Sequence, residues 1–145
     1  MGAVACSLCE ADGGALVYRV PAFRLVRADE PGFPAFYRVV WNEHVAEFSD
    51  LDKGAQRLCL DAVVAVEQAL REQLQPTKIN LASLGNRVAH VHWHVIARFD
   101  WDSHFPSPVW AAAQRASPAD RCAGVLAQRE QTEALMVRKL RALGA

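Results

Sequence analysis

The sequence lacks an excess of charge of either sign, because its 16 lysine and arginine residues equal its 16 aspartate and glutamate residues. This balance argues against a protein that binds nucleic-acid polymers, which normally carries a basic excess or patch. A mononucleotide ligand needs only a few local donors and is not excluded. No apolar run approaches the ~20 residues that a membrane-spanning helix needs, so we expect no membrane interaction.

The sequence also lacks internal repeats, low-complexity segments and a recognisable leader. Its first residues, MGAVACSLCE, contain neither the basic segment nor the long apolar segment of a secretory signal. We therefore expect a cytoplasmic protein. An apolar content of 52% and a charged content of 22% are ordinary for a globular protein. The length suits a single domain over residues 1–145.

Five segments have the apolar, turn-flanked patterns of strands. They cover residues 15–20, 23–27, 35–41, 77–83 and 90–99. Between the third and fourth strands, we expect a main helix that begins at Ser49, which can cap it, and ends at the Gln75-Pro76 pair. Its apolar residues recur at helical spacing, which indicates one face packed on a sheet. They are Leu58, Cys59, Ala62, Val63, Val66, Leu70 and Leu74.

A second helical stretch is expected from Pro118 toward Leu143, because proline preceded by serine is typical of a helix start. Gly124 is the point where this stretch can be interrupted. The order of elements predicts an α+β fold, a five-stranded antiparallel sheet with one main helix packed on it. In this prediction residues 1–110 form the core and residues 111–145 form a C-terminal helical extension.

The sequence HVHWHVI, at residues 90–96, holds three of the five histidines of the chain. His90, His92 and His94 alternate with apolar residues, which is the pattern of a strand with one buried face. Since alternate residues of a strand point to the same side, we expect the three imidazoles on one face. The other face should pack into the core through Val91, Trp93 and Val95.

Two chemistries use such a row of histidines, and a chance cluster on an exposed sheet face is the plainest alternative. One chemistry is a metal site, since neutral imidazole is a common metal ligand. The other is nucleophilic catalysis, in which one imidazole attacks and its neighbours position the group under attack. The spacing alone does not choose between these two chemistries.

A Cys-x-x-Cys pair, Cys6 and Cys9, lies near the start of the chain. Cysteines of a cytoplasmic protein are more often thiols or metal ligands than disulfides. The pair can therefore be a redox dithiol, half of a zinc site or a coincidence. A redox dithiol normally follows a strand, and we expect no strand before Cys6. Cys59 and Cys122 fall among apolar residues of expected helices, so we expect them to be core thiols.

The histidine run resembles the His-φ-His-φ-His-φ-φ sequence, with φ apolar, of the histidine triad (HIT) nucleotide hydrolases and transferases. Three further positions agree more loosely. Asn80 and the Gly85-Asn86 pair lie where the family usually has Asn and Gly-Gln, and Arg98 matches the arginine of its φ-Pro-Arg segment. The resemblance covers about residues 6–110, and it implies the same α+β order of elements.

In the HIT family the middle histidine attacks the α-phosphate of a nucleotide, so the resemblance places the nucleophile at His92. His94 is then expected to donate to the phosphoryl oxygens or to the leaving group. Asn80 and Asn86 would add neutral donors around the same oxygens and stabilise the developing charge. A turn-forming role is the alternative for Asn86.

The resemblance also implies that the nucleoside binds on the strands before the main helix. An acidic residue that contacts the ribose hydroxyls is expected at Asp29, with Glu30 as the near alternative. Both lie in a loop, where a plain surface charge is the other explanation. Apolar contacts to the base could come from a set of residues that core packing explains as well: Phe23, Leu25 and Phe36.

Some HIT proteins hold a structural zinc ion with an N-terminal CxxC, a histidine just past the third strand and the first histidine of the triad. The resemblance therefore implies a zinc site of Cys6, Cys9, His44 and His90. Two cysteines and two histidines are a closed tetrahedral combination that suits a structural ion. HIT proteins are commonly dimers, so the resemblance also implies a homodimer.

The activity implied by the resemblance is that of a nucleotide hydrolase or nucleotidyl transferase. It would release a nucleoside monophosphate from a dinucleoside polyphosphate or a nucleoside phosphoramidate through a nucleotidyl-histidine intermediate. The segment HFPSPVW, at residues 104–110, resembles the tail of bacterial diadenosine tetraphosphate hydrolases. Two alternatives stay open: a zinc-dependent hydrolase whose three histidines hold a catalytic ion, and a nucleotide-binding regulatory module with little turnover.

Overall fold

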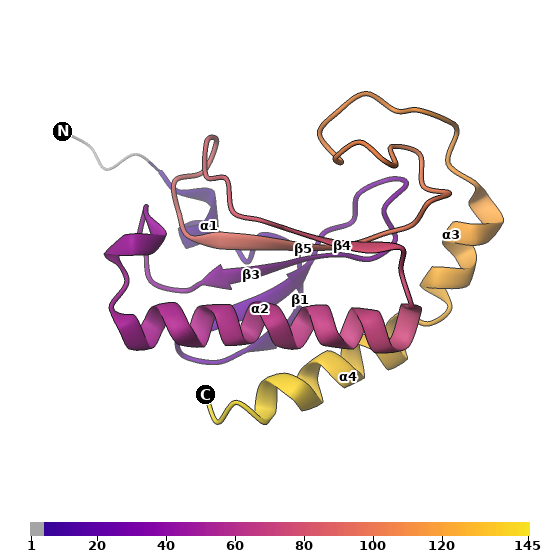
Figure 1. Ribbon diagram of the computed structural model, residues 1–145. Helices are drawn as coiled ribbons and strands as arrows, with labels where there is room; N and C mark the ends of the chain where they lie inside the picture. The colour runs from indigo at the N-terminus through magenta and orange to yellow at the C-terminus, as the bar shows by residue number, and fades with distance from the viewer. Residues whose placement is uncertain (1–4) are drawn as a thin grey trace.

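The computed structural model describes residues 5–145, so residues 1–4 of the predicted core lie outside the described residues. Five strands form one antiparallel sheet in the order β1-β2-β3-β5-β4, which confirms the predicted α+β fold (Figure 1). The strands are β1 (Ala15–Arg19), β2 (Phe23–Arg27), β3 (Phe36–Trp41), β4 (Lys78–Ala82) and β5 (His92–Arg98). The histidine strand β5 is therefore an inner strand, flanked by β3 and β4.

The main helix, α2 (Lys53–Leu74), begins four residues later than predicted. Ser49 does not cap it, because this serine lies in a short 3-10 helix, η1 (Phe48–Asp50). The cap is Asp52, whose carboxylate accepts a hydrogen bond from the backbone amide of Ala55 at 2.8 Å. A carboxylate at this position both satisfies a free amide and offsets the helix dipole, which explains the choice of Asp52.

The predicted end and the predicted buried face of α2 are both confirmed. Gln75 adopts a left-handed conformation, with a φ of 49°, and Pro76 cannot continue the helix. The side chains of the apolar stripe pack into the main core, where Leu58 and Leu74 are partly buried and the rest are buried. Those buried are Cys59, Ala62, Val63, Val66 and Leu70, joined by Ala65 and Ala69.

The C-terminal stretch forms two helices, α3 (Ala119–Leu126) and α4 (Arg129–Arg141), rather than one helix broken at Gly124. Gly124 lies inside α3, and nothing lies within 4 Å of a side chain built on it, so this glycine imposes no break. Pro118 is the residue before α3 rather than its first residue. The break falls at residues 127–128, which lets α4 turn and pack against α2.

One face of the sheet is covered by α2 and α4 together (Figure 1). Met136 and Leu140 of α4 have no exposed surface and belong to the same core as the α2 stripe. Glu133 of α4 accepts hydrogen bonds from Arg27 at 2.6 Å and from the Tyr37 hydroxyl at 3.1 Å. The C-terminal helices are therefore part of the fold on this face of the sheet.

The opposite face of the sheet carries α1 (Ser7–Glu10) and the irregular segment 99–118, which Figure 1 shows away from α2 and α4. Val91, Trp93 and Val95 face the helices and pack in the main core, as predicted. The histidine strand consequently turns its polar residues toward the other face, where the candidate site lies. Among residues 5–145, no helix is both long enough and apolar enough to cross a membrane.

Candidate functional site

A cavity of about 680 Å³ lies on the face of the sheet opposite α2. This volume is in the range of sites for small organic ligands, about 300–1,000 Å³. Its walls come from the sheet, α1, the turn at residues 84–88, the loop at residues 30–33 and residues 109–110 of the 99–118 segment. The residues that matter for its chemistry are Glu30, Phe33, Phe36, Arg38, Asn86, His92, His94 and Trp110.

His92 has its two ring nitrogens in different environments. The Nδ1 nitrogen lies 2.6 Å from the backbone carbonyl oxygen of His90. A carbonyl oxygen can only accept, so Nδ1 carries the proton and donates it to this bond. In the neutral ring, Nε2 then keeps an unprotonated lone pair, and the ring belongs to the lining of the cavity. This is the state that a nucleophilic imidazole requires.

His94 is buried beside His92, with the two ring centroids 5.1 Å apart. The rings of Phe36 and Trp110 also lie edge-on to it, at centroid distances of 5.5 and 5.3 Å. Burial, together with the charges of His92 and Arg38, lowers the pKa of His94 to about 4. The ring of His94 is therefore neutral at neutral pH, and it can act as a hydrogen-bond donor but carries no charge.

The His90 imidazole lies on the α1 side of the sheet, like those of His92 and His94, but it does not line the cavity. Strand β5 begins at His92, so His90 precedes the strand. The His90 ring is buried and donates from Nε2 to the carbonyl oxygen of Trp41 at 2.5 Å. Its Nδ1 nitrogen faces Cys6 and Cys9 instead of the cavity.

Not all of the residues predicted to contact the phosphate and the ribose line the cavity. Asn86 lines the cavity, next to a turn in which Gly85 has a φ of 81°. Asn80 lies instead in a neighbouring depression, where its side-chain oxygen accepts a hydrogen bond from Arg98. Asp29 is 70% exposed and lies 3.4 Å from Arg27, whereas the alternative, Glu30, lines the cavity.

The four residues of the predicted zinc site lie together, next to the cavity. The ligand atoms of Cys6, Cys9, His44 and His90 all lie within 4.8 Å of one another. The two Nδ1 nitrogens are 3.3 Å apart, and the three close sulfur–nitrogen distances are 3.3, 3.4 and 3.6 Å. A tetrahedral zinc ion would separate two nitrogens by about 3.3 Å, and a sulfur from a nitrogen by about 3.5 Å. The spacing of these atoms therefore fits a single zinc ion.

Comparison with protein families agrees with this geometry. The HIT domain family matches residues 12–101, which is more than half of the chain. The chain belongs to the HIT domain family. The matched region contains β1 to β5 and α2, and therefore both histidines of the cavity. It excludes Cys6, Cys9 and the C-terminal helices.

Solved structures of HIT proteins share the fold. A histidine triad protein from Bradyrhizobium japonicum is 24% identical, with a TM-score of 0.72 over 94% of this chain and 97% of that one. A hypothetical histidine triad nucleotide-binding protein from Sulfolobus tokodaii is 15% identical, with a TM-score of 0.57 and coverages of 90% and 85%. A Zn-bound histidine triad family protein from Mycobacterium smegmatis is 18% identical, with a TM-score of 0.57 and coverages of 96% and 93%. The comparison with curated proteins found no match.

A buried arginine holds the CxxC turn of this HIT protein against the sheet. Arg24 of β2 is 3% exposed and donates to the backbone carbonyls of Leu8, Ala11 and Asp12 at 2.6 to 3.1 Å. It also donates to the side-chain oxygen of Asn42 at 3.0 Å. Five donors in a rigid plane suit this task, since carbonyls at the end of a one-turn helix have few other partners.

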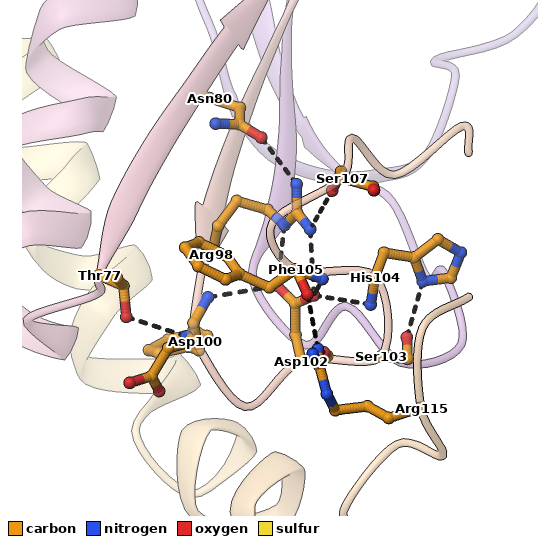
Figure 2. Close-up of polar contacts among 11 residues, drawn as sticks. Thr77, Asn80, Arg98, Asp100, Asp102, Ser103, His104, Phe105, Ser107 and Arg115 are labelled. Carbon is orange, nitrogen blue, oxygen red and sulfur yellow. Dashed lines mark hydrogen bonds and ion pairs between the residues drawn. The ribbon is translucent and has the colours of Figure 1, made fainter. Parts of the chain in front are cut away.

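A second buried arginine anchors the segment that closes the cavity (Figure 2). Arg98 donates to both carboxylate oxygens of Asp102, at 2.8 and 3.0 Å, and to the carbonyl of Ser107 at 2.8 Å. Asp102 also accepts from the backbone amides of Phe99, His104 and Phe105. Burial raises the pKa of Asp102, but the hydrogen bonds from Arg98 and the amides outweigh it, and the pKa lies below its ordinary value.

Sequence reasoning identified Arg98 through the family resemblance but missed three residues of the site. Arg38 occurs at an alternating position of an apolar strand, and a charge on the cavity face of a sheet is the signal that could have marked it. Asp102 and Trp110 lie in a segment without regular structure. No periodicity constrains such a segment, so only the contacts of the folded chain identify Asp102 as its anchor and Trp110 as a residue that lines the cavity.

Proposed function

We propose that this HIT protein is a nucleotide hydrolase that works through a nucleotidyl-histidine intermediate on His92. The hydrogen bond from His92 Nδ1 to the carbonyl of His90 is the observation that carries the proposal, because it leaves Nε2 free to attack. Membership of the HIT family supports a nucleotide as the ligand, as does the similarity to the histidine triad nucleotide-binding protein from Sulfolobus tokodaii.

The proposed reaction has two steps at the α-phosphorus of the nucleotide. In the first, the Nε2 lone pair of His92 forms a P–N bond while the bond to the leaving group breaks and its electron pair departs with that group. In the second, water forms a P–O bond and gives up a proton to the solvent, the P–N bond breaks with its electron pair returning to Nε2 of His92, and nucleoside monophosphate is released. Splitting one displacement into two is the general advantage of a covalent nucleophile. His94 Nε2–H and the amide of Asn86 would donate to the phosphoryl oxygens.

For the nucleoside, the lining of the cavity favours Glu30 over Asp29 as the acidic contact to the ribose. Glu30 lines the cavity, while Asp29 is exposed and faces Arg27. Phe33 and Phe36 would provide apolar contacts to the base. The predicted contact of Asn80 with phosphate oxygens stays a prediction, with its side-chain NH2 as the remaining donor.

The proposal is tested by mixing the protein with diadenosine tetraphosphate, quenching in the first turnover and measuring the intact mass. We expect an increase by one adenylyl group, located by peptide analysis on the peptide that contains His92. Acid lability of the adduct with stability to base is the behaviour of a P–N bond to histidine. Consumption of substrate without any adduct in a fully quenched time course would contradict the covalent route.

We propose that Cys6, Cys9, His44 and His90 hold a structural zinc ion. The interatomic distances support this, as does the zinc reported for the Mycobacterium smegmatis relative. The Nε2–H of His90 donates to Trp41, which leaves Nδ1 as the nitrogen that would bind the metal. When bound, the ion would cross-link the N-terminal turn to the sheet, and it would take no part in the chemical steps.

Replacing one ligand should release this ion. In Cys9→Ser we expect less than half of the wild-type zinc content and a melting temperature lower by roughly 5–10 °C, because ligand loss removes folding free energy. Metal analysis and thermal unfolding measure the two effects. Cys122→Ser is the matched control, since Cys122 is a free cysteine outside the cluster, and both quantities should stay at wild-type values. Full zinc content in Cys9→Ser would remove Cys9 from the ligand set.

The sequence left two alternative functions open, and the structure bears on them differently. A catalytic zinc held by all three histidines does not fit, because Nδ1 of His90 points to the cysteines and its Nε2 donates to the carbonyl of Trp41. A regulatory module with little turnover would show the same geometry, so only the adduct and turnover measurements separate it from a hydrolase. A homodimer stays a prediction, which light scattering of the purified protein tests directly.

A further inference from the structure

Arg38 is the one cavity-lining cation that contacts a histidine of the site within residues 5–145. It lies on β3 directly opposite His94 of β5, and its side chain is half-buried. The Arg38 Nε nitrogen donates to Nδ1 of His94 at 3.3 Å, and Nη1 donates to the carbonyl of Gly13 at 3.1 Å. Gly13 has a φ of 87°, a conformation that favours glycine and presents this carbonyl to the arginine.

This guanidinium has no carboxylate partner in the described part of the chain. No carboxylate oxygen of residues 5–145 lies within 4.0 Å of Arg38, in contrast to the paired Arg27 and Arg98. Glu30, across the cavity, is the acidic group that favours its charge, while burial lowers the pKa of Arg38. A half-buried cation without a counter-ion is costly by itself, so its position in a cavity indicates an anionic ligand.

The contact with Arg38 also determines which nitrogen of His94 carries the proton. A guanidinium has donors only, so His94 Nδ1 must accept and must be unprotonated. The single proton of the neutral ring then lies on Nε2. Adding a second proton would have to occur at Nδ1, which would break this hydrogen bond and place a positive charge against Arg38. Arg38 therefore keeps His94 as a neutral Nε2–H donor.

We propose that Arg38 fixes this state of His94 and supplies the positive charge of the cavity, which selects nucleotides whose leaving group is a phosphate chain rather than an amine. The inference rests on the proposed function. When the P–O bond to a phosphate chain breaks, the electron pair departs on an anion that needs no proton and that Arg38 can bind. When a P–N bond to an amine breaks, the nitrogen must gain a proton. A neutral His94 could give one only by becoming an imidazolate anion.

The kinetic test compares diadenosine tetraphosphate with an adenosine phosphoramidate of an uncharged alkylamine. For the wild type we expect kcat/KM to be higher for the tetraphosphate by a factor of about 100, comparable to the effect of one preorganised charge or donor. Arg38→Met should lower kcat/KM for the tetraphosphate by about 100-fold and leave the phosphoramidate value within a few-fold. Arg38→Lys should recover part of the loss, since it keeps the charge.

The control for removal of an arginine is Arg57→Met. Arg57 lies on the exposed side of α2, so this variant should keep the wild-type kcat/KM for both substrates. Circular dichroism and zinc content establish that each variant is folded. If Arg38→Met does not fold, the comparison of the two substrates is made with Arg38→Lys instead. An equal loss for both substrates in the variant would overturn the selective role of Arg38. If the wild-type protein prefers the phosphoramidate, the inferred preference for a phosphate-chain leaving group is wrong, but the proposed function stands. If the wild-type protein cleaves neither substrate, both the preference and the proposed function are wrong.

A second measurement does not depend on turnover. The 15N chemical shifts of His94 in the labelled protein at pH 7 should show Nδ1 unprotonated and Nε2 protonated. In Arg38→Met the ring should populate both tautomers, because the donor to Nδ1 is gone. A wild-type ring protonated at Nδ1, or an unchanged tautomer in the variant, would overturn the positioning role even if hydrolysis is confirmed.

Discussion

The His92→Ala variant is expected to lose turnover by about 10⁶-fold, the scale of loss when a covalent nucleophile is removed from a hydrolase. Its fold and its nucleotide affinity should persist, because the ring of His92 makes one hydrogen bond to a neighbouring carbonyl and is only half-buried. Steady-state hydrolysis of diadenosine tetraphosphate measures the loss. Equilibrium titration with a non-hydrolysable analogue measures the affinity.

The matched control is His104→Ala, because His104 is also half-buried but lies outside the cavity and contacts Ser103 and Phe33. This variant should keep wild-type turnover within a few-fold. A complementary variant, His92→Gly, should regain some turnover when imidazole is added, since the free ring can occupy the vacated space and supply the lone pair. Wild-type turnover in His92→Ala would show that the phosphorus is not attacked by this residue.

The largest effect on stability is expected for Asp102→Ala, at roughly 3–5 kcal/mol of unfolding free energy. The substitution leaves the buried guanidinium of Arg98 without its carboxylate and three backbone amides without an acceptor. Urea unfolding followed by circular dichroism measures the loss. The segment that carries Trp110 to the cavity should become mobile, so nucleotide affinity should fall in the same variant.

Asp100→Ala is the control for the stability prediction. Asp100 is exposed, and Figure 2 shows its carboxylate pointing away from the Arg98 network, so the change should stay within about 0.5 kcal/mol. The double variant Arg98→Met with Asp102→Ala should lose less than the sum of the single losses, because it leaves no unpaired buried charge. A loss below about 1 kcal/mol for Asp102→Ala would contradict the anchoring role of the pair.

Local patterns were enough to predict the five strands, the end of α2 and its buried face. Each of these depends on periodicity or on a turn residue such as Pro76, which acts within its own segment. The roles proposed for the cavity histidines and for the cluster of Cys6, Cys9, His44 and His90 were also predictable, but only through resemblance to the HIT family. Spacing alone left a metal site and a nucleophile as equal explanations for the histidine run.

The features that were missed depend on contacts between distant segments. His90 faces Cys6 and Cys9 rather than the cavity, and β5 begins two residues later than the alternation suggests. The break between α3 and α4 is set by packing of α4 on α2, and Gly124 has no influence on it. The partners of Arg38 and Asp102 become visible only in the folded chain. Sequence patterns therefore located the chemistry but not the residues that hold it in place.

The packing of α4 has a practical consequence for the choice of expression boundaries. A fragment that stops at residue 101, where the family match ends, would remove Met136 and Leu140 from the interior. It would also strip Glu133 from Tyr37 and Arg27, and so leave an apolar surface beside α2 open to water. Such a truncated protein should aggregate. Grafting or fusion experiments with this protein should therefore place the junction after residue 141, where α4 ends.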